Sequence, residues 1–516
     1  MGTVWPLKHV AFPDFSAPET QEWWKNEIVR FHAQSYLSSK TLCMLGVTRA
    51  GRIYDTKSLY GFYESIATRA GMEAATSKRP LVLTRSSFPS GGRYAGHWLG
   101  DNLAAWGDLQ VSISGIQDFS MFGIPYVGAD ICGFRGSTTE GLCLRWHQLG
   151  AFYTFSRNHN DIGQVRQDPA AWPSVAAATR QVYLFRYRYL PYLYTLHYLA
   201  ATTGSTVVRP LFFEFPNDEA AHANHEQFMW GEAMLIAPVL RQGAKEVYAY
   251  LPREATWYSL RDTDYGVKTG SGFTFLSAPL DQLPPVLIRG SPILLISLSV
   301  QKASKLLMKA VENGVVELSS FLTQRKGAMA PTIMEHSSRI VETWVKVLPF
   351  SMFNVMNSSS PGVSHRSINI ISSGGCIIPR QAPEMTTIAS RKNPLELVIA
   401  LNGTDEAWGT LFWDDGESPI TPNCCSVYQF KLRVSATSTE FTVTGYSANI
   451  TIPSLNVIDI LGYDRTPNFE TAVVNGIPRS LSECASYDST KQIVSINCTN
   501  LLDISSVGKS ISWSNT

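Results

Sequence analysis

Apolar runs that end in a polar residue recur through the first third of the chain. Arg85 ends one such run, and Asp101 and Asp130 end the next two. Asp101, Asp130 and His159 follow one another at intervals of 29 positions. A period near 30 is typical of successive strand–helix units, which bring such residues together at the carboxyl ends of parallel strands. One Asp after a strand is more often a helix N-cap, but three polar residues in phase favour a functional site.

Helical spacing of apolar residues alternates with these runs. It predicts helices over residues 17–34, 58–75 and 174–201, the last interrupted at Pro191. Trp23 and Trp24 lie within the first of these segments, and we expect both to face the core. From about residue 207 the pattern changes to short alternating strands separated by turns. The fold class predicted is therefore α/β followed by β.

Composition narrows the classes of partner. Hydrophobic residues make up 44% of the 516 positions, and 43 Lys and Arg nearly balance 42 Asp and Glu. This balance gives no electrostatic attraction to nucleic acid or to anionic membranes, so neither is expected as a partner. Aromatic residues, at 11%, suit carbohydrate binding but more often fill large cores.

The ends of the chain and its longest apolar run say little about its compartment. Residues 1–6 have neither the basic nor the apolar segment of a signal peptide. The run Pro292–Val300 is too short to span a bilayer. We leave the localisation open.

The segments around the polar residues resemble glycoside hydrolase family 31. They read TRSSF at 84–88, GRYAGHWLGDN at 92–102, FGIPYVGADICGF at 122–134 and FSRNH at 155–159. The resemblance extends over roughly residues 1–34, 52–290 and 368–516. Within the family, the lysosomal and intestinal α-glucosidases are the most similar. The resemblance implies hydrolysis of α-linked glucose, with an α-glucoside or maltooligosaccharide as substrate and no cofactor.

The resemblance also implies roles for particular side chains. Asp101 matches the general acid/base of the family. The residues that match its substrate-binding positions are Arg85, Trp98, Asp130, Phe134 and His159. Arg85 and His159 would donate to sugar hydroxyls, Asp130 would accept from them, and the aromatic residues would line the pocket.

Cysteine pairing and glycosylation follow the same resemblance. Cys132 and Cys143 match a disulfide of the lysosomal enzyme, and Cys484 with Cys498 is a plausible second bridge. No cysteine spacing fits a zinc site, so no metal is expected. Asn-x-Ser/Thr sequons, relevant only in a secretory compartment, occur at Asn357, Asn402, Asn449 and Asn497.

The nucleophile of the family has no counterpart in this sequence. A retaining glycosidase needs two carboxyl groups about 5–5.5 Å apart, and the second should follow the helix at 17–34. Residues 35–44 read SYLSSKTLCM, without an acid, and Asp55 matches a position downstream of the nucleophile. A neighbouring carboxylate normally keeps the acid of such a pair protonated. Without one we expect Asp101 to be ionised, and glycosidase turnover to be low.

The resemblance divides the chain into four parts. We expect a partial (β/α)8 domain at residues 1–205, followed by two β-sandwich-like domains, a proximal one at 206–296 and a distal one at 368–516. Residues 297–367 have no counterpart and read as an insertion, functional or from a miscalled coding sequence. The barrel is expected to be incomplete, because the family pattern starts in this sequence after its second strand and its fourth strand is missing. A partner chain would then complete it, since open parallel sheets expose apolar side chains and backbone groups.

Three functions stay open at this point. The first is an α-glucosidase-like hydrolase of impaired activity. The second is a non-catalytic glucan-binding or scaffold protein that keeps the pocket without the reaction. The third is a non-functional truncated product.

Overall fold

The computed structural model describes most of the chain. The described residues are 2–4, 8–10, 13–30, 46–290, 374–401, 405–419, 424–448 and 450–516. The expected insertion at 297–367, the segment 35–44 and the sequons at Asn357, Asn402 and Asn449 lie outside them. Among the helices in the described ranges, none is both long and apolar enough to span a bilayer.

Parallel strands form the centre of the first half of the chain. β5 (Leu83–Thr84), β6 (Gly96–Trp98) and β7 (Val127–Gly128) pair in parallel, and β8 (Asp130–Ile131) pairs in parallel with β9 (Arg157–Asn158). β7 and β8 follow each other directly in the sequence. The amide of Phe155, just before β9, donates to the carbonyl of Val127 in β7 at 3.1 Å, so the chain that leads into β9 also lies beside β7. Four neighbouring parallel strand segments thus run in chain order. This confirms the strand–helix repeat predicted from the 29-residue period.

Helices separate and cover these strands. They are α4 (Trp106–Met121), α5 (Glu140–Gly150), α6 (Pro173–Arg188) and α7 (Leu190–Thr203), with short 3₁₀ turns at Gly91–Arg93 and Pro169–Ala171. The apolar stripe of α4 is fully buried and joins the core that contains Val127 and Ile131. The helix expected at 174–201 is two helices, and the break falls at Tyr189, directly before the turn that contains Pro191. A proline is tolerated in the first turn of a helix, because amides there have no partner within the helix and no hydrogen bond is lost.

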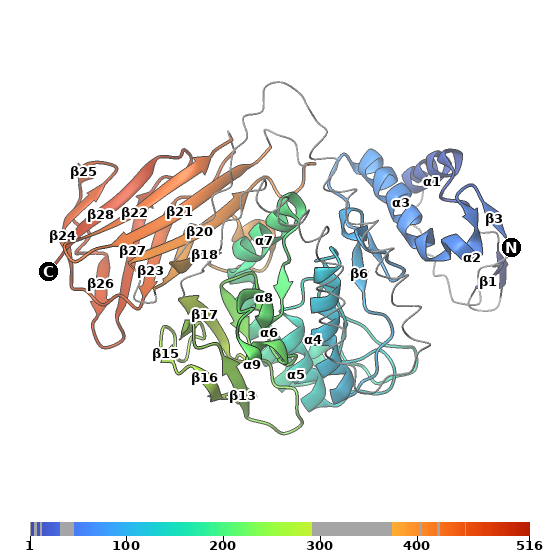
Figure 1. Cartoon of the computed structure of the whole chain (residues 1–516), viewed down its shortest axis with the longest axis horizontal. Helices are drawn as coiled ribbons and strands as arrows, with labels where there is room; N and C mark the ends of the chain where they lie inside the picture. The colour runs from blue at the N-terminus through green and yellow to red at the C-terminus, as the bar shows by residue number, and fades with distance from the viewer. Residues whose placement is uncertain are drawn as a thin grey trace, which may run out of the picture. The chain divides into compact units, whose positions relative to one another are not determined.

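Two helices dominate the amino-terminal part. The elements are β1 (Gly2–Val4), β2 (Lys8–Val10), α1 (Pro18–Arg30), β3 (Val47–Thr48), β4 (Gly51–Arg52), α2 (Ile53–Thr56), a 3₁₀ turn at Lys57–Leu59 and α3 (Tyr60–Thr76). Figure 1 shows α1 beside α3, and the Trp24 indole donates to the Thr68 hydroxyl at 2.9 Å. Trp23 is 46% exposed, so the expectation that both tryptophans face the core is wrong for Trp23. Adjacent helical residues point about 100° apart, and only one of the two faces α3.

A smaller β-rich part follows. A six-stranded sheet has the order β10-β11-β12-β17-β14-β15, and β13 pairs with β16 in a separate two-stranded sheet. The bounds are β10 (Val208–Arg209), α8 (Leu211–Glu214), α9 (Glu219–His222), β11 (Phe228–Trp230), β12 (Met234–Ile236), β13 (Glu246–Leu251), β14 (Thr256–Ser259), β15 (Lys268–Thr269), β16 (Gly272–Ser277) and β17 (Val286–Gly290).

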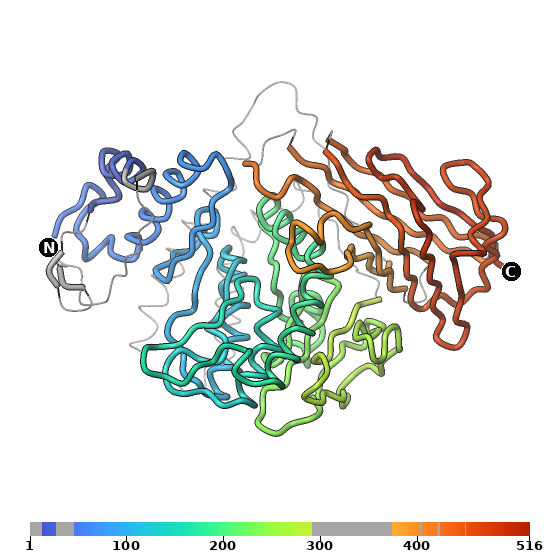
Figure 2. Tube along the Cα trace, turned by 180° about the vertical axis from the view of Figure 1, so that it is seen from behind, coloured from blue at the N-terminus to red at the C-terminus, as the bar shows by residue number. Residues whose placement is uncertain are grey.

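The carboxyl-terminal part is one hydrogen-bonded sheet of eleven strands around its own apolar core. Figure 2 shows its long extended segments running beside one another, in orange to red. Its order is β25-β24-β28-β22-β21-β20-β18-β19-β23-β27-β26. The bounds are β18 (Gly375–Gln381), α13 (Thr387–Ser390), β19 (Leu395–Ala400), β20 (Glu406–Trp413), β21 (Ser426–Val434), β22 (Ser438–Tyr446), β23 (Leu455–Leu461), β24 (Pro467–Val474), β25 (Ile477–Pro478), β26 (Ala485–Asp488), β27 (Ile493–Leu502) and β28 (Lys509–Asn515).

The predicted class, α/β followed by β, is confirmed. The sandwich-like character of the last part comes from a single curled sheet, because β18 joins its two halves by pairing with β19 on one side and β20 on the other. The strands on either side of residues 297–367 belong to different sheets: β17 lies in the six-stranded sheet and β18 in the eleven-stranded one. The bridge Cys484–Cys498 is present, and Asn497, the described sequon asparagine, is exposed on β27.

Asp414, directly after β20, joins distant parts of the chain. Its buried carboxylate accepts from Arg79 at 2.7 Å and from the Tyr194 hydroxyl at 2.9 Å. Its backbone carbonyl accepts from Arg391. Because these partners come from before β5, from α7 and from after β18, one carboxylate neutralises cations supplied by separate elements.

We therefore expect Asp414→Asn to lower the free energy of unfolding by about 3 kcal/mol, since two partly buried guanidinium groups lose their anion. Denaturant unfolding followed by circular dichroism measures this. The matched control is Asp415→Asn, because the Asp415 side chain is exposed and its hydrogen bonds within the described part of the chain go to Glu417 and Ser418 of the same turn. If both substitutions lowered the free energy of unfolding equally, Asp414 would not have the special role of neutralising these guanidinium groups.

Candidate functional site

A buried carboxylate lies at the centre of the predicted site. Asp130, at the start of β8, is fully buried, and its Oδ1 accepts from Arg157 Nη2 at 2.5 Å and Nε at 3.1 Å. Burial raises the pKa of Asp130 above its ordinary value, while the hydrogen bonds from Arg157 act in the opposite direction. The indole of Trp98 also lowers the pKa of this carboxyl by hydrogen bonding. The carboxylate is thus held between a guanidinium and an aromatic ring.

Trp98 forms a wall beside this pair. It ends β6 and is 7% exposed. The guanidinium carbon of Arg157 lies 4.9 Å from the centre of its ring, and that of Arg85 lies 5.7 Å away. Two cations near the ring are favourable, because the faces of the indole carry negative potential. Arg85 reaches this position beside Gly100 (φ +89°), where a Cβ would fall 2.6 Å from Arg85 Nε.

The backbone around Asp130 leaves no room for larger residues. A Cβ at Gly128 would lie 1.8 Å from the Phe155 carbonyl oxygen, so β7 and the chain before β9 approach closely only because this residue is glycine. After Asp130 the chain turns sharply through Cys132 (φ +74°) and Gly133 (φ +90°). The disulfide Cys132–Cys143 ties this turn to α5, which confirms the predicted pairing.

Two amide side chains brace the loops at the strand ends. Asn102 donates to the Asp130 carbonyl at 2.9 Å and accepts from the Phe134 amide at 3.0 Å. Gln167 donates to the carbonyls of Ile131 and His159 at 3.2 and 3.0 Å. The loops after β6, β8 and β9 are therefore fixed to one another through side-chain amides.

Phe134 and His159 form a second aromatic element of the site. Their rings stack with centres 5.0 Å apart and planes inclined by 29°. His159 also interacts electrostatically with Asp130 and lowers the pKa of that carboxyl. The structure thus brings together, through direct or shared partners, five predicted residues: Arg85, Trp98, Asp130, Phe134 and His159.

Asp101 lies in the loop after β6 and has a different partner. Its Oδ2 accepts from Arg135 Nη2 at 3.0 Å, and the Arg135 side chain is 62% exposed. Among the described residues, the cation that contacts Asp101 is Arg135, not the predicted sugar-binding residues Arg85 or His159. The Asp101 carboxylate therefore stands at the open edge of the cluster, in a solvent-accessible ion pair.

Sequence reasoning missed three contributors: Arg157, Arg135 and Asn102. Arg157 had a usable signal, because it precedes His159 by two positions at the end of a strand, where side chains two apart share a face. Arg135 and Asn102 gave no usable signal in the sequence. Arg135 contacts Asp101, 34 positions away, and Asn102 contacts Asp130, 28 positions away, both across loops.

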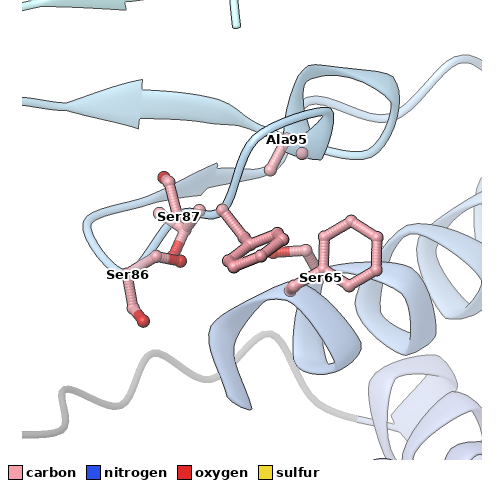
Figure 3. A pocket seen from close by; sticks show the side chains of 8 residues that line it. Ser65, Ser86, Ser87 and Ala95 are labelled. Atoms are coloured by element: carbon pink, nitrogen blue, oxygen red, sulfur yellow. The ribbon is translucent and has the colours of Figure 1, made fainter. Parts of the chain in front are cut away.

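A small pocket lies beside the cluster rather than in it. Figure 3 shows it next to the start of α3 and the loop after β5, with Ser65, Ser86, Ser87 and Ala95 in its lining. Its volume of about 10 Å³ corresponds to roughly one water molecule. It is too small for a sugar.

One group of side chains in the described part of the chain has the proximity of a metal site. It contains Cys132, Cys143 and His147. Both sulfurs are already bonded to each other, so they cannot act as thiolate ligands. His147 instead pairs through Nε2 with the Asn158 amide at 3.0 Å.

The sequence matches two family profiles in chain order. The profile "Glycosyl hydrolases family 31 TIM-barrel domain" covers residues 1–196, and "Glycosyl hydrolase family 31 C-terminal domain" covers residues 204–294. The chain belongs to glycoside hydrolase family 31.

Relatives within this family are far longer. Intestinal sucrase-isomaltase of Rattus norvegicus is 34% identical over 97% of this chain and 25% of its own length. Lysosomal alpha-glucosidase of Mus musculus is 35% identical over 81% of this chain and 41% of its own length. A probable alpha-glucosidase of Oryza sativa subsp. japonica is 40% identical over 81% of this chain and 42% of its own length. The chain thus spans between a quarter and about two fifths of these relatives.

Solved structures share the fold. The glucosidase II alpha subunit superposes with a TM-score of 0.69 at 19% identity, over 98% of this chain and 49% of that one. The family 31 dextranase of Flavobacterium johnsoniae superposes with a TM-score of 0.70 at 19% identity, over all of this chain and 57% of that one.

His147 supports the site and makes it sensitive to acid. Burial lowers the pKa of His147, which is 2% exposed, to about 4. The unfolded chain takes up this proton near pH 6.5, so between about pH 6.5 and 4 it binds more protons than the folded chain does. The stability contributed by the neutral ring is therefore full above pH 6.5 and is lost as the pH falls toward 4.

We expect His147→Gln, which keeps an acceptor for Asn158, to flatten the fall of the unfolding free energy between pH 7 and pH 4 by about 2–3 kcal/mol. Chemical unfolding at several pH values measures the slope. The exposed His222 provides the matched substitution, His222→Gln, which should leave the slope unchanged. An unaltered slope in His147→Gln would show that this ring is not kept neutral by burial.

Proposed function

We propose that this chain is an α-glucosidase-like protein that binds the terminal glucose of an α-glucoside or maltooligosaccharide. The ligand would lie at the carboxyl ends of β6, β8 and β9. The observation that carries the proposal is the buried Asp130–Arg157 pair beside Trp98. A fixed acceptor, a fixed donor and an apolar ring are the three elements that recognise the hydroxyls and the C–H face of a sugar.

Each predicted residue then has a role. Asp130 accepts from adjacent hydroxyls of the sugar, and Arg85 and His159 donate to others. Trp98 and the Phe134–His159 stack bound the ring on two sides. Asp101, at the open edge, is the general acid/base that would face the glycosidic oxygen, and to do so its carboxylate must leave Arg135.

Hydrolysis by this chain is proposed to be weak. A retaining reaction begins when a second carboxylate attacks the anomeric carbon, and residues 35–44 contain no such group. A second chain that completes the barrel, as predicted from the sequence, could supply one. We also propose the division of the chain predicted from the sequence, with limits at 1–205, 206–296, 297–367 and 368–516.

A non-catalytic glucan-binding function is the second candidate. It is favoured by the ion pair between Asp101 and Arg135, because a carboxylate engaged by a guanidinium is not free to donate a proton. This candidate shares the binding site and differs only in turnover.

The proposal predicts binding without efficient turnover. Maltotriose should bind the purified chain in isothermal titration calorimetry, and Asp130→Asn should weaken binding about tenfold or more because the charged acceptor is lost. Asp118→Asn, the same change at an exposed position of α4, should bind as the parent does. If Asp130→Asn and Asp118→Asn bind equally well, the site lies elsewhere.

Turnover separates the two candidates. On a nitrophenyl α-glucoside, which needs little help from an acid, we expect release of nitrophenol about 10³-fold slower than by a complete family member. Azide is a small external nucleophile, and it should accelerate release with formation of glucosyl azide if the nucleophile is the missing group. Acceleration supports a hydrolase site that lacks one carboxylate. Binding without acceleration supports the glucan-binding protein, and full turnover without azide would refute the impairment.

A further inference from the structure

We propose that Asn497 carries an N-linked oligosaccharide, and that this glycan is added before β27 enters the eleven-stranded sheet. The inference concerns a covalent modification and does not depend on sugar binding at Asp130. Asn497, Cys498 and Thr499 form an Asn-x-Thr sequon, which accepts oligosaccharides in proteins of the secretory route. The surroundings of this sequon in the sheet support both parts of the proposal.

The two side chains that define the sequon lie on the outer side of β27. Exposure alternates along the strand: Asn497 and Thr499 are exposed, whereas Ile496 and Cys498 are 0% and 2% exposed. The side-chain amide of Asn497 forms no hydrogen bond within the described part of the chain. A bulky hydrophilic group on its nitrogen would therefore extend into solvent without breaking a contact of the fold.

The cysteine inside the sequon indicates the compartment. Cys498 is bonded to Cys484, and Cys132–Cys143 is a second disulfide. Structural disulfides form in oxidising compartments, such as the lumen of the endoplasmic reticulum, and are rare in the cytosol. Because sequons are modified in proteins that pass through the same route, the bridges favour modification of Asn497 independently of the sequon itself.

The folded sheet blocks access to the backbone of the sequon. β27 lies between β23 and β26 (Figure 1). Asn497 is opposite Val457 of β23, and its backbone amide donates to the carbonyl of Cys484 at 2.8 Å. Modified sequons normally lie in surface loops, where a transferase can surround the peptide. A strand that is paired on both sides and bridged through Cys498 becomes accessible only by unfolding, so the transfer has to precede strand pairing and closure of the bridge.

The transfer needs one co-reactant, a lipid-linked oligosaccharide diphosphate. The side-chain nitrogen of Asn497 forms a bond to the anomeric carbon of the first sugar, and the bond from that carbon to the diphosphate oxygen breaks. The diphosphate leaves with the electron pair, and one amide proton is released. Formation of a disulfide takes seconds to hours, so Cys498 remains a thiol for a period in which the sequon is accessible.

Secretion of the full chain from cultured animal cells, behind a cleavable leader, tests the site. Peptide N-glycosidase in heavy-oxygen water removes the glycan and labels the asparagine that carried it, and mass spectrometry locates the label. We expect the label at Asn497. Thr499→Ser should keep it because the hydroxyl remains, whereas Thr499→Val should abolish it although the side chain keeps its shape. Thr490→Val, at an exposed threonine between β26 and β27, is the matched control and should keep the label.

The order of events is tested on purified chain made in bacteria, to which solubilised oligosaccharyltransferase and its lipid-linked donor are added. The reduced, unfolded chain should be modified at Asn497, and the folded chain with its disulfides closed should not. Absence of the label from Asn497 in the secreted parent, or a label that survives Thr499→Val, would overturn the site. Modification of the folded chain as fast as the unfolded one would overturn the order. Since no step involves a glucan ligand, failure of maltotriose to bind at Asp130 would leave these expectations intact.

Discussion

Burying Asp130 is the constraint on which the rest of the site depends. A carboxylate with no solvent exposure is costly unless cations and donors surround it, and here Arg157 supplies two of the donors. Arg157 can do so only if β9 runs parallel to β8, which requires the close approach at Gly128. The same guanidinium lies over Trp98 and so links β6 to the pair. The proposed recognition of a sugar hydroxyl and the correct packing of the strands therefore rest on one ion pair.

Rigid and open parts of the site differ in how they are held. Around Asp130, the amides of Asn102 and Gln167 and a disulfide fix the loops, so a hydroxyl would meet groups already in place. Asp101 has no such frame, because its partner Arg135 is mostly exposed. Solvent screening makes such a pair weak. The geometry thus holds Asp130, the proposed acceptor of sugar hydroxyls, more firmly than Asp101, the proposed proton donor.

The sequence predicted these features unequally. The 29-residue period located the parallel strands and most of the site, because a polar residue that ends an apolar run is a local signal. The partners of Asp130 and Asp101 were not predictable in the same way, since Arg157 and Arg135 reach them across 27 and 34 positions. The eleven-stranded sheet was expected as a sandwich because its strands look alike in sequence. The parallel pairing of β18 with β20 is a non-local choice that no strand reveals alone.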